Sequence, residues 1–266
     1  MSNVARHLGL MNIPVELVSV WGNDPDGERI TQEMLRCRVG MSHVKQSKEP
    51  TGKYAAILES DGSLFCAACS DVTSNYLTPD FFAKLSLELA GAAAIIADTN
   101  ISEGALEWLS FFCKNKNVPL IIEPVSVEKA LKLAKSDLSG VFMITPNEDE
   151  LPSLCRSSEK EEQSCLDELL KRGVKRIWLR RGEKGSEMVE RNERLSLSAL
   201  PITIKDSTGA GDAALAGWLA GWYSGLDALS CLQLGHSLAY EVLQQNGSLL
   251  PSADIPFILS KYYPDA

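Results

Sequence analysis

The sequence predicts an α/β protein with a central, mostly parallel β-sheet flanked by helices on both faces. Between residues 80 and 179, short apolar strands alternate with amphipathic helices, which indicates βαβ units. These strands are apolar along their whole length, as is typical of a parallel sheet covered on both sides. Two further runs, 54–58 and 63–69, flank the turn sequence Glu-Ser-Asp-Gly and indicate a β-hairpin. We expect this hairpin to form a small β lid over the sheet.

The expected elements follow one another without an internal repeat or a low-complexity linker. The first third contains a helix at 3–11, a strand at 15–21, a turn at 22–27 and a helix that ends near 36. After the lid, helices are expected at 80–90, 102–115, 126–136, 148–156 and 160–172, and strands at 92–97, 119–122, 140–144 and 176–179. We therefore expect a single domain over residues 1–266, with the lid inserted at about 44–72.

The composition is that of a globular protein, with 45% hydrophobic and 23% charged residues among 266. The net charge of −9 argues against nucleic acids and anionic membranes as partners, although it does not count against a bound nucleotide. No uninterrupted apolar run reaches membrane-spanning length, and the N-terminus lacks a signal-peptide core. The seven cysteines are scattered and odd in number, which is typical of reduced thiols. We expect a soluble, cytoplasmic protein.

The stretch from Lys205 to Asp212, Lys-Asp-Ser-Thr-Gly-Ala-Gly-Asp, precedes a strongly apolar helical run. Gly209 and Gly211 let a ligand approach the backbone, and the start of a helix presents unpaired N–H groups that favour an anion. A carboxylate at such a place suits a base that deprotonates a hydroxyl group beside a phosphate. An ordinary loop with Asp212 as the helix N-cap explains the same residues. The local pattern alone leaves both interpretations open.

Polar turns follow four of the predicted strands, at 98–100, 123–126, 145–150 and 180–185. Ligands of open parallel sheets bind beyond the carboxyl ends of the strands, so these turns are expected to line one cleft. Turns are polar in many proteins for reasons unrelated to function, and this alternative applies to each of them.

Taken in order along the chain, these motifs resemble those of the PfkB, or ribokinase-like, carbohydrate kinases. The stretch 206–212 is similar to the family's C-terminal signature, with serine at 207 where threonine is usual. The segment 147–150 resembles its N-x-x-E element, 182–185 its G-x-x-G turn, and 22–27 its G-x-D-x-x-G turn. The resemblance covers nearly the whole chain. It implies a ribokinase-like fold and an ATP-dependent phosphotransferase with an alcohol group as acceptor.

The resemblance implies a catalytic role for the start of the apolar helix. Asp212 is expected to accept the proton of a sugar 5′-hydroxyl as that oxygen attacks the γ-phosphate of ATP. The backbone amides of Gly209, Ala210 and Gly211 are expected to stabilise the charge on the transferred group.

Three residues are candidates for metal binding on the same resemblance. Asn147 and Glu150 are expected to hold Mg²⁺, partly through water, because their i, i+3 spacing on a helix places both side chains on one face. Without the resemblance, the same residues fit an ordinary helix start after Pro146. Asp206 is expected to contribute to a site for a monovalent cation such as K⁺.

The nucleotide is expected to contact Thr208, Gly182 and Gly185 in the family's manner. His236 falls where family members approach the adenine, although a core or surface position is the alternative for a lone histidine. Arg180 and Arg181 occupy a slot that usually carries threonine. Arg180 is expected to contact the ATP phosphates, or else to lie on a surface turn.

The sugar half of the site matches the family less completely. Asn3 resembles the end of the family's N-terminal G-G-x-x-N element, so the opening strand is expected to be missing, and with it part of the substrate pocket. Asn3, Thr51 and Lys53 are expected to contact the substrate, with a solvated strand position as the alternative for Lys53.

Segments of the lid and the strand-end turns resemble the pseudouridine kinase branch of the family. A small-molecule substrate is expected, and pseudouridine is the first candidate. Two alternatives are a kinase of another sugar or nucleoside, such as ribose, fructose or adenosine, and an inactive member that binds a nucleotide or a partner without turnover. The exposed edges of the lid would also suit a homodimer contact.

Overall fold

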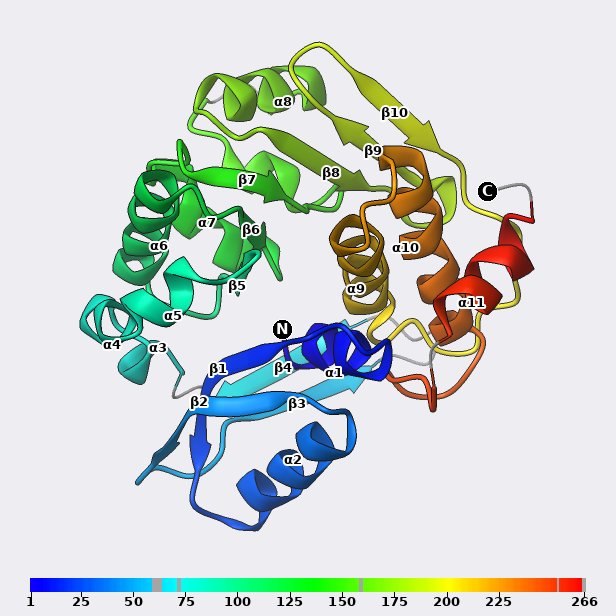
Figure 1. Ribbon diagram of the computed structural model, residues 1–266. Helices are drawn as coiled ribbons and strands as arrows, with labels where there is room; N and C mark the ends of the chain where they lie inside the picture. The colour runs from blue at the N-terminus through cyan, green and yellow to red at the C-terminus, as the bar shows by residue number, and fades with distance from the viewer. Residues whose placement is uncertain (59–63, 71–72, 158–159, 253, 265–266) are drawn as a thin grey trace.

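The computed structural model describes residues 1–58, 64–70, 73–157, 160–252 and 254–264, and its main sheet has six strands in the order β10-β9-β8-β7-β6-β5 (Figure 1). The parallel part consists of β5 (Ile95–Asp98), β6 (Leu120–Glu123), β7 (Val141–Ile144) and β8 (Arg176–Arg180). Two antiparallel strands, β9 (Ser186–Val189) and β10 (Arg194–Leu197), complete one edge. The predicted α/β fold with a mostly parallel sheet is confirmed.

Helices cover both faces of this sheet. One face packs against α6 (Glu103–Lys116), α7 (Val127–Lys135) and α8 (Glu162–Lys171), and the other against α1 (Ser2–Leu10), α9 (Ala210–Tyr223) and α10 (Ala228–Leu243). Alternation along the strands divides the side chains: Ile122 faces the first helical layer, and its neighbour Ile121 faces the second. Both residues are almost completely buried. The strands are apolar on both sides because each face of the sheet packs against its own core.

The helix α9 is buried over its length, from Ala213 to Gly221. Its apolar residues extend around the whole helix, as is typical of a helix enclosed by other elements. Trp218 and Trp222 stack with ring centroids 6.2 Å apart, and Trp218 lies 6.4 Å from Trp178 on β8. This aromatic group fixes α9 against the sheet and thereby fixes the position of its N-terminus.

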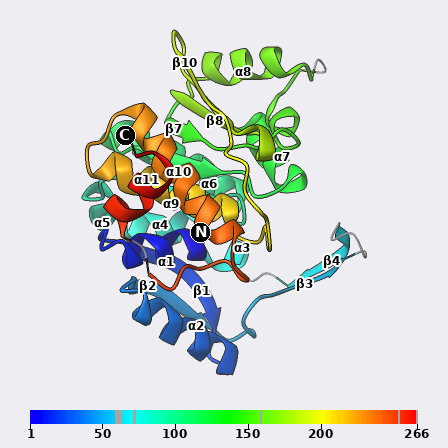
Figure 2. The ribbon, with the colours of Figure 1, turned by 90° about the vertical axis from the view of Figure 1, so that its right-hand side faces the viewer.

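The N-terminal part forms two smaller sheets. The strands β1 (Glu16–Gly22) and β2 (Gly40–Ser47) pair in parallel, and α2 (Pro25–Arg36) connects them. The strands β3 (Lys53–Leu58) and β4 (Leu64–Ser70) form the antiparallel hairpin, which projects from the rest of the molecule in Figure 2. The expected hairpin turn at 59–62 lies outside the described residues. A small core around Leu17, Trp21 and Met34 joins β1, α2 and α1.

Several local predictions differ from the structure. The strand β2 was not expected. It includes residues 44–47, which we assigned to the lid but which pair with β1. The strands β9 and β10 were also not expected, because exposed polar residues such as Arg194 and Ser196 interrupt their apolar pattern. The helix expected at 80–90 is interrupted at Leu85, between α4 (Pro79–Lys84) and α5 (Ser86–Ala90). Two further short helices are α3 (Thr73–Tyr76) and α11 (Ile255–Tyr262).

The helix predicted at 148–156 is wrong. This segment contains only the short 3₁₀ helix η1 (Leu151–Leu154). Its start is constrained by Asn147, which pairs with Arg180 in an isolated parallel bridge and so continues the sheet. Pro152 has no N–H group to extend an α-helical hydrogen-bond ladder.

In the part of the chain that the structure describes, no helix is both long enough and apolar enough to span a membrane.

Candidate active site

The first turn of α9 carries Asp212, and the residue before the helix has a conformation that favours glycine. Gly209 is the N-cap with φ of 80°, and a Cβ atom there would lie 2.4 Å from the Cβ of Ser248. The amides of a first helical turn have no acceptor within the helix. The Ala210 amide donates a long 3.3 Å hydrogen bond to the Ser207 carbonyl, and within the described chain the Gly211 amide has no acceptor. The backbone therefore supplies a donor and the positive end of the helix dipole beside the Asp212 carboxylate.

A second helix end fixes this carboxylate. Nδ2 of Asn3 in α1 donates a 2.8 Å hydrogen bond to Oδ2 of Asp212. Oδ1 of Asn3 accepts a weaker bond of 3.4 Å from the hydroxyl of Ser248. The two contacts orient the amide of Asn3 so that its donor faces Asp212. The structure thus brings the expected substrate residue Asn3 into direct contact with Asp212, which the sequence did not predict.

The carboxyl ends of β6, β7 and β8 bring three polar residues together. Nη2 of Arg180 lies 2.5 Å from Oε1 of Glu123 and 2.5 Å from the carbonyl oxygen of Thr145. The hydroxyl of Thr145 donates to the other oxygen of Glu123 at 2.6 Å. Glu123 is buried and both of its oxygens accept hydrogen bonds, as a buried carboxylate requires.

The two consecutive arginines point to different surroundings. Arg181 forms ion pairs with Glu148, Glu162 and Glu187 on the outer side of the turn. Arg180 instead lies against α9, since a Cβ atom built on Gly211 would be 2.7 Å from Nη1 of Arg180. Arg180 is therefore at the start of α9, whereas Arg181 stabilises the turn.

Asn147 and Glu150 form a closed pair, although the segment is a turn and not the helix we predicted. The Glu150 amide donates to Oδ1 of Asn147 at 2.8 Å, and the Asn147 amide donates to Oε2 of Glu150 at 3.0 Å. Burial raises the pKa of the Glu150 carboxyl, and the nearby Glu123 carboxylate acts in the same direction. A cation near Glu150 would favour its ionised form.

The donor set at this pair fits Mg²⁺. Amide and carboxylate oxygens are ligands that Mg²⁺ accepts, and this ion usually keeps several waters and binds substrate phosphates. Among the described residues, no group of three or more His, Cys, Asp or Glu side chains is placed to hold a metal. The chemistry of Asn147 and Glu150 therefore suits an ion that binds together with a phosphate group.

Asp206 and Thr208 belong to the turn that leads into α9. Oδ1 of Asp206 accepts the Thr208 amide at 2.8 Å, and Oδ2 accepts the Gly247 amide at 3.0 Å. These hydrogen bonds, with those from Thr208 the strongest, lower the pKa of Asp206. Asp206 thus joins the turn before α9 to the segment around Gly247.

The predicted nucleotide residues lie at separate places. Gly182 begins the 3₁₀ turn η2 (Gly182–Lys184), and Gly185 follows it with φ of 99°. His236 is in α10 and is buried; its Nε2 lies 2.7 Å from the hydroxyl of Ser186, and its Nδ1 lies 3.2 Å from that of Tyr240. Both ring nitrogens therefore have partners inside the protein, and the structure does not bring His236 together with Asp212.

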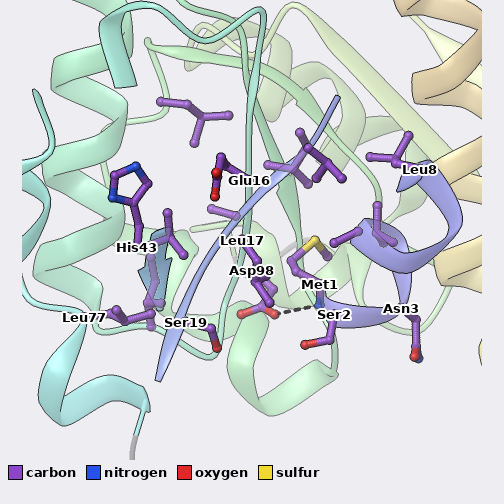
Figure 3. A pocket seen from close by; sticks show the side chains of 18 of the residues that line it. Met1, Ser2, Asn3, Leu8, Glu16, Leu17, Ser19, His43, Leu77 and Asp98 are labelled. Atoms are coloured by element: carbon purple, nitrogen blue, oxygen red, sulfur yellow. Dashed lines mark hydrogen bonds and ion pairs between the residues drawn. The ribbon is translucent and has the colours of Figure 1, made fainter. Parts of the chain in front are cut away.

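A cavity of about 1270 Å³ contains the predicted substrate residues, and its lining includes Asn3, Thr51, Lys53, Asp98 and Asp212. Figure 3 shows Asp98 pointing toward Met1 at the start of α1, and the dashed line marks their 3.2 Å ion pair. Apolar side chains such as Leu8 and Leu17 line another part of the same space. The cavity thus joins a polar end, which holds two carboxylates, to an apolar wall.

The lid residues reach this cavity through different contacts. The hydroxyl of Thr51 donates to Oδ1 of Asp24 at 2.6 Å and accepts the Gly22 amide at 3.0 Å. Lys53 is exposed and pairs with Asp26 at 2.9 Å. Thr51 therefore connects the base of the lid to the predicted G-x-D-x-x-G turn, and Lys53 is the more accessible of the two.

A family model for pfkB family carbohydrate kinases matches residues 1–255. The chain belongs to this family. Its members are phosphotransferases with a hydroxyl group as acceptor.

Individual relatives agree with this assignment. The kinase is 25% identical to pseudouridine kinase of Escherichia coli over 263 residues, which cover 97% of this chain and 83% of that protein. Arabidopsis thaliana ribokinase, solved in complex with ribose and ATP, matches with a TM-score of 0.79 and 21% identity, covering 98% of this chain and 86% of its own. An Escherichia coli putative ribokinase II, solved with ATP and Mg²⁺, has a TM-score of 0.80 and 17% identity, covering 100% and 88%.

Two acidic residues beside the candidate site were not among the predicted site residues. Asp98 and Glu123 end β5 and β6, and both lie in turns that the sequence indicated as polar ends of apolar strands. That signal identified the turns but could not distinguish these side chains from ordinary polar turn residues.

Proposed function

We propose that the kinase transfers the γ-phosphoryl group of ATP to the 5′-hydroxyl of a ribosyl substrate, with pseudouridine as the first candidate. The observation that carries this proposal is the Asp212 carboxylate, held by Asn3 at the start of α9 and facing a cavity with room for a nucleoside. A base in that place stands between an acceptor hydroxyl and the anion-binding end of a helix.

The proposed step needs little covalent chemistry from the protein. The acceptor oxygen forms a bond to the γ-phosphorus, the bond from that phosphorus to the bridging oxygen breaks, and the hydroxyl proton passes to Asp212. The amides of Gly209, Ala210 and Gly211 would stabilise the charge of the transferred group. Asn147 and Glu150 would hold Mg²⁺, which neutralises phosphate charge when bound.

The remaining assignments concern the nucleotide and a cation. We infer that Thr208, Gly182 and Gly185 face ATP, since all three belong to turns at the carboxyl end of the sheet or at the start of α9. Asp206 would contribute to a K⁺ site. Both carboxylate oxygens of Asp206 already accept backbone hydrogen bonds, so such a site would use their remaining lone pairs.

Pseudouridine is favoured as the acceptor because the relative named for it matches most of both chains. The polar end of the cavity, with Asp98 and Asp212, suits ribosyl hydroxyl groups, and the apolar wall suits a base. Ribose is the second candidate, because a ribokinase complex with ribose shares the fold. The third alternative is a chain that binds a nucleotide without turnover.

The proposal is tested by ADP release from the purified chain with ATP, Mg²⁺ and a panel of pseudouridine, ribose, fructose and adenosine. Asp212→Asn should abolish turnover, whereas Asp227→Asn should retain it, because Asp227 only caps α10 and asparagine caps equally well. Turnover on ribose but not pseudouridine would replace the proposed acceptor. Full activity in Asp212→Asn would refute the general-base assignment.

A homodimer through the lid is a further part of the proposal. Tyr54, Ile57 and Phe65 of the hairpin are 66%, 60% and 67% exposed, which is unusual for large apolar side chains on one element. Analytical ultracentrifugation should give a dimer mass that falls to the monomer mass in Ile57→Lys. A monomeric wild type would contradict this contact.

A further inference from the structure

The ion pair of Arg180 with Glu123 uses only one of the three guanidinium nitrogens. The Arg180 side chain is 17% exposed, and a single nitrogen, Nη2, makes both contacts, to Glu123 and to the Thr145 carbonyl. Nε is buried without a hydrogen-bond partner among the described residues. Arginine usually binds one carboxylate through two nitrogens, so this arrangement leaves much of the guanidinium unused.

The unused nitrogen lies at the catalytic helix. Nη1 is the atom that a side chain at position 211 would meet, at 2.7 Å from an added Cβ, and within the described chain it has no protein acceptor. The first-turn amides of α9 begin at the same place. A fixed positive charge and the positive end of a helix dipole therefore converge on one point.

The charges around this point require a cation. Asp212, Glu150 and Glu123 are acidic, and Glu123 is the one that Arg180 neutralises. An incoming phosphate group would add negative charge beside Asp212, which opposes both binding and deprotonation of the acceptor. The N-terminal ammonium of Met1 pairs with Asp98, so Nη1 of Arg180, which lies against Gly211, is the protein cation that we place on the phosphate side.

We propose that Arg180 is a catalytic residue whose Nη1 binds the phosphoryl group in transfer, and that Glu123 and the Thr145 carbonyl are positioning groups that hold it. The inference rests on ATP as the donor. As the bond from the acceptor oxygen to phosphorus forms and the bond to the bridging oxygen breaks, Arg180 keeps its protons. It stabilises the charge on the transferred oxygens, and Asp212 takes the proton.

The decisive measurement is calorimetric binding of ATP and of ADP, each with Mg²⁺, to the purified chain without an acceptor. Arg180→Gln should weaken ATP binding about tenfold to a hundredfold, the range for a lost charge-assisted hydrogen bond, and change ADP binding by less than about twofold. Arg176→Gln is the matched control and should leave both affinities unchanged, because Arg176 begins β8, at the end opposite Arg180, and pairs with Glu190.

A double variant tests the proposal even if Arg180→Gln alone does not fold. Arg180→Gln leaves Glu123 buried without its partner, so Glu123→Gln combined with Arg180→Gln removes both charges together. The double variant should keep a native circular dichroism spectrum and lose the preference for ATP over ADP. The proposal would be overturned if the affinities for ATP and ADP fell equally. It would also be overturned if both variants kept the wild-type preference for ATP over ADP.

Chemical rescue provides a readout that a structural role would not change. Guanidinium chloride at millimolar concentration should restore part of the turnover of Arg180→Gln, and an equal concentration of sodium chloride should not. An absence of rescue in a folded Arg180→Gln chain would count against a direct phosphate contact. The calorimetric measurement of ATP and ADP binding needs no acceptor. Its result therefore does not depend on whether the proposed acceptor is correct.

Discussion

The Nδ2 atom of Asn3 donates a 2.8 Å hydrogen bond to Oδ2 of Asp212, and the two residues are 209 positions apart in the chain. The contact joins the first helix to the catalytic helix and fixes one oxygen of the proposed base. In the proposed mechanism, Oδ1 of Asp212, which has no hydrogen-bond partner among the described residues, would face the acceptor hydroxyl.

Loss of the Asn3 donor should therefore slow the chemical step. Asn3→Ala is expected to reduce kcat by roughly tenfold to a hundredfold, because a hydrogen bond to a charged group contributes about 1.5–3 kcal/mol. Asn3→Asp should reduce it further, since it places a second carboxylate against Asp212. Steady-state kinetics with the preferred acceptor measures both, and an unchanged kcat in both variants would contradict a role for Asn3.

Glu150 should determine the dependence of the kinase on Mg²⁺. Glu150→Gln is expected to raise the Mg²⁺ concentration for half-maximal activity by about tenfold, in line with the loss of a metal-binding or metal-orienting carboxylate. Glu148→Gln is the control, because Glu148 pairs with Arg181 and Lys184 at the surface. Titration of Mg²⁺ at saturating ATP measures the shift; chelation of the metal should abolish turnover in every variant. Equal Mg²⁺ requirements for the two variants would remove Glu150 from the metal site.

A methyl group at position 211 should displace Arg180 without unfolding the protein. The added Cβ would meet the far end of a side chain, at 2.7 Å from Nη1, so the guanidinium would have to shift and the backbone would not. Gly211→Ala is expected to lower kcat about tenfold with little change in melting temperature. Gly104→Ala controls for helix propensity, since its Cβ would meet only Pro79 Cγ at 3.7 Å, and it should stabilise the fold by about 0.5 kcal/mol. Wild-type activity in Gly211→Ala would argue against the Arg180 contact.

Two glycines of the η2 turn should differ in their tolerance of alanine. Gly185 has φ of 99°, and a Cβ there would lie 2.1 Å from the Leu197 carbonyl oxygen. Gly185→Ala should cost about 1–3 kcal/mol from backbone strain, plus the effect of that overlap. Gly182 has φ of 54° with nothing near its Cβ, so Gly182→Ala should cost only about 1 kcal/mol. Urea denaturation measures both, and equal costs would show that the overlap relaxes.

The buried His236 should make the protein less stable in acid. Burial lowers its pKa from 6.5 to about 4, so as the pH falls below 6.5 the unfolded chain takes up a proton that the folded chain does not. This contribution is complete above pH 6.5 and reaches a loss of roughly 2 kcal/mol near pH 5, at 1.36 kcal/mol per pH unit. Urea denaturation at several pH values should show a smaller pH dependence for His236→Gln than for wild type or His43→Gln. An identical slope in all three chains would contradict the prediction.

The parallel strands could be predicted because each is apolar on both faces, whereas β2, β9 and β10 could not, because solvent removes the need for an apolar pattern at their exposed positions. Asn147 and Glu150 contact each other, but not on the helix that we expected. A turn with reciprocal backbone hydrogen bonds also joins residues three apart, so the spacing did not require a helix.

Contacts between distant strands are beyond the reach of local patterns. Arg180 and Glu123 are 57 positions apart, and their meeting depends on the register of three parallel strands. The sequence left two alternatives for Arg180, phosphate contact and surface turn. The structure gives the surface role to Arg181 and places Arg180 against Gly211.

The tryptophan cluster at α9 provides an intrinsic fluorescence signal for movement of this helix. Trp178, Trp218 and Trp222 are three of the five tryptophans in the chain, and they contact one another along the helix that begins with the catalytic turn. The emission of packed indole rings depends on their surroundings and on their mutual arrangement. Movement of α9 when a phosphate group binds at its N-terminus would therefore appear as a change in intrinsic emission, without any label and before any product forms.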